Sequence, residues 1–202
     1  MSKPTPPQGD HAVITGGFVP GRAEPDGHLP RPLLEFAESM LASFGDARLV
    51  WLAGLPGSGK STLLRACRVV DDRTQTIELS RELAAMGHSD GPPRPGGLQA
   101  LGDAVGRVRT RCAQQSARSV VATTGIPIES VPCIQRELLL VLSIDPARAD
   151  LQLRSRPQRA ARTATPAEIV MHHQNLERLA RLPHARLVEV PLIPTLVGRE
   201  VP

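Results

Sequence analysis

The sequence predicts a three-layer α/β fold, with about five parallel strands and helices on both faces of the sheet. Short apolar runs of strand length alternate along the chain with amphipathic segments of helical spacing. A glycine-rich stretch follows the first apolar run directly and leads into a helical segment. Alternation of this kind indicates a parallel sheet, because parallel strands need crossover connections that are usually helices.

The predicted elements begin after a proline- and glycine-rich stretch, residues 1–30, which we expect to be a flexible N-terminal arm. Residues 31–202 then form one domain. The expected helices cover residues 31–45, 60–69, 80–87, 98–116 and 166–181, with a further short helix beginning within 130–136. The expected strands cover residues 48–54, 74–79, 118–125, 137–145 and 185–192.

Composition limits the function classes. The net charge is +4, which invites a nucleic-acid partner, but the excess is arginine, since Lys3 and Lys60 are the lysines among 24 basic residues. The chain has no tyrosine, and its aromatic residues are Phe18, Phe36, Phe44 and Trp51, too few to build base-stacking platforms. No apolar run of membrane-spanning length occurs, so we expect no membrane partner. The N-terminus shows no signal-like apolar segment, and we expect a cytoplasmic protein.

Residues 54–62 carry the pattern G-x-x-x-x-G-K-[ST] followed by threonine. Glycines allow the sharp turns that direct consecutive backbone N–H groups at oxygen anions, and the following helix adds the positive end of its dipole. The lysine ammonium reaches the β- and γ-phosphates of a nucleotide, and the serine hydroxyl suits Mg²⁺. The sequence thus predicts a nucleotide-binding loop (P-loop) with Ser61 as metal ligand, made of Gly54, Pro56, Gly57, Ser58, Gly59, Lys60, Ser61 and Thr62.

The surroundings of this loop exclude two classes of P-loop protein. A guanine-selective switch needs an Asn-Lys-x-Asp element, and no lysine of the chain stands in one. Motor and transporter ATPases need an apolar strand that ends in aspartate, whereas the strand expected at 118–125 ends in Ala122, Thr123 and Thr124. The pattern that remains is that of small kinases, in which an arginine-rich lid closes over the nucleotide.

The chain resembles the P-loop kinases grouped around polynucleotide kinase, zeta toxin, chloramphenicol phosphotransferase and gluconate kinase. The resemblance covers residues 48–192 and is carried by "GLPGSGKST", by "VVATT" where the group often has V-V-D-A-T, and by "LLLVLSIDPARADLQLRSRPQR" followed by "TPAEIV". It implies a nucleoside-kinase-like domain over residues 31–202 that uses ATP and Mg²⁺.

The resemblance also implies an arginine-rich lid. Arg154 and Arg156 would come over the phosphates or stack on the adenine, with help from Arg159 or Arg162. One well-placed arginine can raise the rate of phosphoryl transfer about 10³-fold or more. The alternative is an exposed helix whose arginines reflect the general arginine bias of the chain.

Two acidic positions depart from the group's pattern. The group usually carries an aspartate just after the second strand, which takes the proton of the acceptor hydroxyl. This chain has Ser80 there. We predict Asp72 as the base, with Asp71 and Glu82 as alternatives and loss of the carboxylate as a third.

The second departure concerns the metal. Thr123 and Thr124 can hold a magnesium-bound water but supply no charge. Asp145, at the end of the strand expected at 137–145, would supply that charge if it faces the cleft, and is otherwise a capping or loop residue.

The predicted activity is an ATP-dependent phosphotransferase, or kinase, that moves the γ-phosphoryl group to a hydroxyl of a small molecule or nucleotide. Lys60, Asp72, Arg154 and Arg156 would be its catalytic residues, and residues 72–97 and 124–136 would bound the acceptor pocket. The first alternative is a non-catalytic ATP-binding module, a degenerate kinase that signals to a protein partner. The second alternative is a kinase of nucleic-acid 5′ ends, for which the basic charge is the motivation.

Overall fold

The computed structural model describes residues 29–88, 97–124, 136–144, 147, 149, 166–183 and 185–189. Its helices are α1 (Arg31–Ala42), α2 (Lys60–Val70), α3 (Leu79–Ala85), α4 (Gly97–Ala113) and α6 (Pro166–Ala180). Its strands are β1 (Leu49–Ala53), β2 (Gln75–Glu78), β3 (Ser119–Thr123), β4 (Glu137–Ser143) and β5 (Ala185–Glu189).

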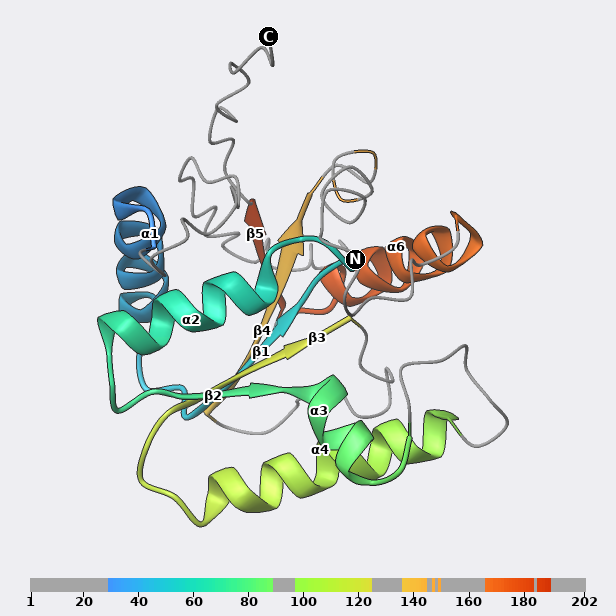
Figure 1. Ribbon diagram of the computed structural model, residues 1–202, viewed down its shortest axis with the longest axis horizontal. Helices are drawn as coiled ribbons and strands as arrows, with labels where there is room; N and C mark the ends of the chain where they lie inside the picture. The colour runs from blue at the N-terminus through green and yellow to red at the C-terminus, as the bar shows by residue number, and fades with distance from the viewer. Residues whose placement is uncertain are drawn as a thin grey trace, which may run out of the picture.

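The five strands form one sheet in the order β2-β3-β1-β4-β5, and every neighbouring pair is parallel. The central strand, β1, is buried at all five positions, as expected of a strand covered on both faces. Because all strands run the same way, their carboxyl ends lie at one edge of the sheet, which we call the carboxyl edge (Figure 1). Ligands of open parallel sheets bind at this edge.

Helices α1 and α2 cover one face of the sheet (Figure 1). Alternate residues of the central strands point into this layer, among them Val50, Leu52, Val120 and Leu140. Leu63, Leu64 and Cys67 of α2 meet them at helical spacing. Burial raises the pKa of the Cys67 thiol to about 12, so this cysteine is a core residue.

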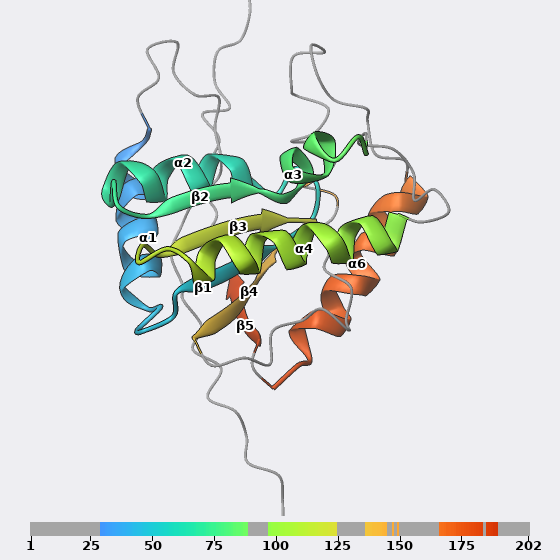
Figure 2. The same ribbon diagram turned by 90° about the horizontal axis from the view of Figure 1, so that it is seen from below.

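Helices α3, α4 and α6 cover the other face, and Figure 2 shows α4 lying along the sheet. Trp51, Val121 and Leu139 point into this layer, where Val105 and Val108 of α4 pack against them. The side chain of Trp51 is completely buried. The two layers and the sheet between them confirm the predicted three-layer α/β fold with five parallel strands.

A polar cluster fixes α4 to the sheet. Glu137, at the first position of β4, accepts hydrogen bonds from the indole nitrogen of Trp51 at 3.2 Å and from the guanidinium group of Arg109 at 3.1 Å. The same guanidinium carbon lies 5.8 Å from the centre of the Trp51 ring. The carboxylate is 9% exposed, so this ion pair holds α4 in place from a largely dry environment.

Most predicted elements agree with the structure to within a few residues. The expected short helix within 130–136 and the arm at 1–30 lie almost entirely outside the described residues, so the predicted domain boundary stays a prediction. Leu29, next to that boundary, packs against the α1 layer. Among the described residues, no helix combines the length and apolar character needed to cross a membrane.

Candidate nucleotide-binding site

The predicted P-loop lies at the carboxyl edge, between the end of β1 at Ala53 and the start of α2 at Lys60. Gly57 and Gly59 have φ angles of 82° and 85°, in the left-handed region that residues with a Cβ rarely adopt. Gly59 is also the residue that precedes the first turn of α2. The two glycines are therefore required by the path of the chain around the loop.

Gly54 is required for a different reason, which is close packing. A Cβ atom at this position would lie 2.8 Å from Ser58 Oγ and 3.1 Å from the Cβ atom of Leu142. The Gly54 N–H also donates to the carbonyl oxygen of Thr123 at 3.2 Å. The first residue of the loop is thus held against both β3 and β4.

Lys60 reaches back into the loop from the first turn of α2. Its Nζ atom donates to the carbonyl oxygens of Gly54 at 2.8 Å and Leu55 at 2.7 Å, and lies 3.4 Å from Ser58 Oγ. The side chain is 9% exposed, so an ammonium charge is concentrated inside a loop with little water around it. Such a charge attracts an anion more strongly than a lysine on an open surface does.

The first turn of α2 adds further donors. The Leu63 N–H bonds to the carbonyl oxygen of Gly59 at 2.9 Å, which is the first α-helical hydrogen bond of α2. The N–H groups before it, on Ser61 and Thr62, have no partner within the helix because of their position. Together with the helix dipole they make this helix terminus suited to an anion. All eight residues predicted for nucleotide binding are therefore together on one loop and one helix start.

The donors near this loop suit a magnesium ion in part. Ser61 is exposed in the first turn of α2, beside Lys60, and Mg²⁺ accepts a hydroxyl together with phosphate oxygens and water. The backbone of Thr123 contacts the loop, and its side chain is an uncharged oxygen donor. Among the described residues, no group of three or more His, Cys, Asp or Glu side chains forms a metal cluster.

The structure does not bring Asp72 to this site, and the prediction that it is the catalytic base is corrected. Helix α2 runs for 11 residues, about 16 Å, and ends at Val70, so Asp72 lies in the turn before β2, at the opposite edge of the sheet. Figure 1 shows this turn at the far end of α2 from the loop. Asp71 is there too, where its carboxylate accepts hydrogen bonds from the Thr74 hydroxyl at 2.6 Å and the Arg73 N–H at 3.1 Å.

Glu82, the other alternative, is committed to a structural contact. It accepts two hydrogen bonds from Arg111, at 2.8 and 2.9 Å, which tie α3 to α4. An acidic residue that the structure does place at the carboxyl edge, two strands from β1, is Glu78, the last residue of β2. It pairs with Arg81 at 2.8 Å and is 23% exposed. The sequence feature that could have identified Glu78 is its position at the end of a predicted strand, directly before the helix that contains Ser80.

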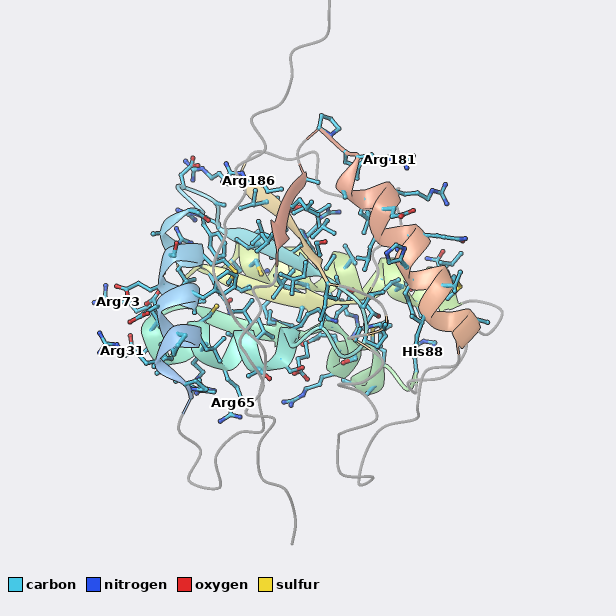
Figure 3. All side chains as sticks on the ribbon, turned by 90° about the horizontal axis from the view of Figure 1, so that it is seen from above. Arg31, Arg65, Arg73, His88, Arg181 and Arg186 are labelled. Atoms are coloured by element: carbon cyan, nitrogen blue, oxygen red, sulfur yellow. The ribbon has the colours of Figure 1, made fainter. Side chains whose placement is uncertain are left out.

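Several predicted residues lie outside the described part of the chain. These are the lid residues Arg154, Arg156, Arg159 and Arg162, the strand-end Asp145, and most of the predicted acceptor-pocket segments. The arginines labelled in Figure 3 lie on more than one side of the molecule. Figure 3 shows Arg31, Arg65, Arg181 and Arg186 at different parts of the periphery.

Comparisons with known proteins place the chain by its fold. No family model and no curated protein sequence matches it. Among solved structures, it is similar to a gluconokinase from Sinorhizobium meliloti, with a TM-score of 0.51, 15% identity, and coverage of 73% of this chain and 85% of the other. A chain of the Pnkp1/Rnl/Hen1 RNA repair complex gives a TM-score of 0.52 and 16% identity, over 65% of this chain and 44% of the other.

A shikimate kinase from Bacteroides thetaiotaomicron is also similar, with a TM-score of 0.49 and 17% identity, over 71% of this chain and 86% of the other. At these identities the likeness concerns the fold alone. The sheet, the loop after β1 and the similarity to the gluconokinase and to the chain of the RNA repair complex show that the chain has the fold of the P-loop kinases.

Proposed function

We propose that this protein is an ATP-dependent kinase that transfers the γ-phosphoryl group to a hydroxyl of a small molecule or nucleotide. The observation that supports this most is the loop itself, in which two left-handed glycines, a buried ammonium group and a helix start converge at the carboxyl edge. Phosphoryl transfer depends mainly on positioning and on cations around the phosphates, and this loop supplies both.

The triphosphate of ATP would lie over the first turn of α2. The N–H groups of Ser61 and Thr62 would donate to phosphate oxygens, and Lys60 would turn from the carbonyl oxygens of Gly54 and Leu55 to the β- and γ-phosphates. Anionic phosphate is a stronger acceptor for an ammonium group than a neutral carbonyl is. Ser61 would hold Mg²⁺, which supplies positive charge to the terminal phosphates when bound.

Glu78 is the base that the geometry supports in place of Asp72. It lies at the carboxyl end of β2, next to β3 and on the same edge as the P-loop. The acceptor oxygen would attack the γ-phosphorus, the bond to the β-phosphate oxygen would break, and the acceptor proton would pass to the Glu78 carboxylate. Arg81, paired with Glu78 at 2.8 Å, would orient that carboxylate. The lid role of Arg154 and Arg156 stays part of the proposal.

The test measures ADP release from MgATP with a panel of hydroxyl acceptors. The panel includes gluconate, nucleosides and an oligoribonucleotide with a 5′-hydroxyl end, because the similar structures include a gluconokinase and an RNA repair enzyme. A kinase gives acceptor-dependent ADP formation that Glu78→Gln lowers by about 10²-fold or more, while the exposed α1 change Glu35→Gln leaves it unchanged. ATP binding without ADP formation for any acceptor would contradict the kinase assignment.

A second candidate is a non-catalytic ATP-binding module that signals to a protein partner. It is favoured by the uncharged end of β3 and by the distance of Asp71 and Asp72 from the loop. This candidate predicts ATP binding with no turnover, and no effect of Glu78→Gln on ATP affinity. Calorimetry and the ADP assay on the same preparation distinguish the two candidates.

A further inference from the structure

The end of β3 is in direct contact with the P-loop. Thr123 pairs with Ala53, the last residue of β1, and its carbonyl oxygen accepts the Gly54 N–H at 3.2 Å. The Thr123 side chain is 5% exposed, and Thr124, the next residue, is half-buried. Positions 123 and 124 therefore stand where β3 ends and meets the loop, so that a charge introduced there would be near the phosphates that the loop would bind.

The charge at this place is unusual for a phosphate site that uses a metal. In the described residues of β1, the loop 54–59 and residues 119–124, no side chain is acidic, and the charged group beside the loop is the Lys60 ammonium. A carboxylate here would attract Mg²⁺, but it would also repel the phosphates whenever the metal is absent. A threonine hydroxyl can still accept Mg²⁺ or its bound water, but it has no net charge with which to repel the phosphates.

Two described strands end in an acidic residue at this edge, Glu78 in β2 and Glu189 in β5, and each of these strands is separated from β1 by one strand. Glu78 ends β2, and β3 lies between β2 and β1. Its carboxylate is paired with the Arg81 guanidinium at 2.8 Å, and this pairing reduces its repulsion of a phosphate. The described residues that border the loop in β1, in the loop itself and at the end of β3 therefore carry a net positive charge toward a metal-free triphosphate.

We infer that this site binds ATP without Mg²⁺ nearly as tightly as MgATP, and that the hydroxyl residues Thr123 and Thr124 set this property. The inference rests on the proposed binding of ATP at the P-loop. It adds that the loop binds metal-free ATP as well as the magnesium complex of ATP. It holds whether the bound nucleotide is turned over or only sensed.

The test is calorimetry of ATP binding in excess EDTA and in excess Mg²⁺. For the wild-type chain, the dissociation constant of ATP in EDTA is expected to be less than about five times the dissociation constant in Mg²⁺. Thr123→Asp places a carboxylate beside the phosphates, so metal-free ATP should bind about tenfold more weakly, while Mg²⁺ restores most of the affinity. Because Thr123 is buried, Thr124→Asp serves as a second variant in case the first does not fold.

Thr110→Asp is the matched control, since Thr110 is exposed in the last turns of α4, near the opposite edge of the sheet. This variant should keep the wild-type ratio. If metal-free ATP binds to the wild type more than about fivefold more weakly than MgATP, the inference is overturned. If Glu78→Gln then abolishes this dependence of ATP affinity on Mg²⁺, the charge that holds the metal comes from Glu78 instead. An unchanged ratio in folded Thr123→Asp and Thr124→Asp also overturns it. No ATP binding in either buffer contradicts the proposed function itself, which is a distinguishable result.

Discussion

The Nζ atom of Lys60 lies 2.7 Å from the carbonyl oxygen of Leu55, inside the loop that separates β1 from α2. The ammonium group is thus held by the backbone of the loop it serves, at the place where a phosphate would enter. The loop is shaped by its left-handed glycines and filled by its lysine, so its geometry follows from the residues of the loop itself. Each prediction below tests one part of that framework.

Gly59→Ala should destabilise the protein, because an alanine at a φ of 85° costs about 1–2 kcal/mol in the left-handed region. The matched control is Gly106→Ala, within α4, where a Cβ atom would meet nothing within 4 Å. That change should raise the free energy of unfolding by about 0.5–1 kcal/mol, since alanine favours helix. Urea unfolding of both variants measures the two changes in the free energy of unfolding, which should have opposite signs. Equal effects would contradict the strained-loop geometry.

Glu137→Gln should lower the free energy of unfolding by about 1–3 kcal/mol, because it weakens hydrogen bonds to Arg109 and Trp51 at a 9% exposed position. Arg109→Met should show a loss that does not add to the first, since the two side chains share one interaction. A double-mutant cycle by urea denaturation measures the coupling. Full additivity would mean that the ion pair contributes nothing to the docking of α4.

Asp71→Asn should destabilise the protein at pH 7 and do so less as the pH falls. The Thr74 hydroxyl, helped by the Arg73 N–H and nearby guanidinium groups, lowers the pKa of Asp71 from its usual 3.8. A lowered pKa in the folded state gives stability that is present above pH 3.8 and is lost as the pH falls through the folded-state pKa. Urea unfolding at pH 7, 5 and 3 tests this.

The neighbouring change, Asp72→Asn, is the control for that series, because the Asp72 side chain is exposed. Its effect on stability should stay within about 0.5 kcal/mol. The same variant should leave ATP binding and any ADP formation unchanged, as its place at the far end of α2 requires. A large loss of activity in Asp72→Asn would contradict the position of Asp72 at the far end of α2 from the loop.

Cys67 should resist thiol reagents in the native protein. With its pKa raised to about 12 by burial, about one thiol in 10⁴ is ionised at pH 8. Burial also raises the pKa of Cys112. In a Cys133→Ser background, a chromogenic disulfide reagent should label no thiol until urea unfolds the chain. Rapid labelling of the folded protein would show that one of the two helical layers is open, and the labelled cysteine, Cys67 or Cys112, would identify which.

The fold and the loop were predictable from local patterns, because a strand, a glycine-rich turn and a helix start occupy consecutive residues. The choice of Asp72 was wrong although the ends of α2 were predicted to within one residue. The expected helix at 60–69 and strand at 74–79 already put Asp72 in the turn between them, at the edge of the sheet where α2 ends. Asp72 was chosen for its acidic side chain, and the order of the elements shows that this turn lies away from the loop.

Contacts between distant residues were not predictable from sequence. The Trp51 and Glu137 hydrogen bond joins residues 86 positions apart, and the guanidinium of Arg118 caps the end of α1 by donating to the carbonyl oxygens of Leu41 and Gly45. From the sequence alone, Arg109 and Arg118 would be taken for exposed arginines, and Glu137 for an exposed acidic residue at the start of a strand. Their roles follow from the register of the sheet, which only the folded structure provides.

The most direct test of the account is calorimetry of ATP binding to Lys60→Ala, with circular dichroism to confirm the fold. Arg68→Ala, an exposed change in the last turn of α2, is the charge-matched control. The account predicts that Lys60→Ala weakens ATP binding by about tenfold to 10²-fold, as loss of a charged hydrogen bond does, while Arg68→Ala binds like the wild type. Wild-type affinity in a folded Lys60→Ala protein would contradict the claim that this loop holds the triphosphate.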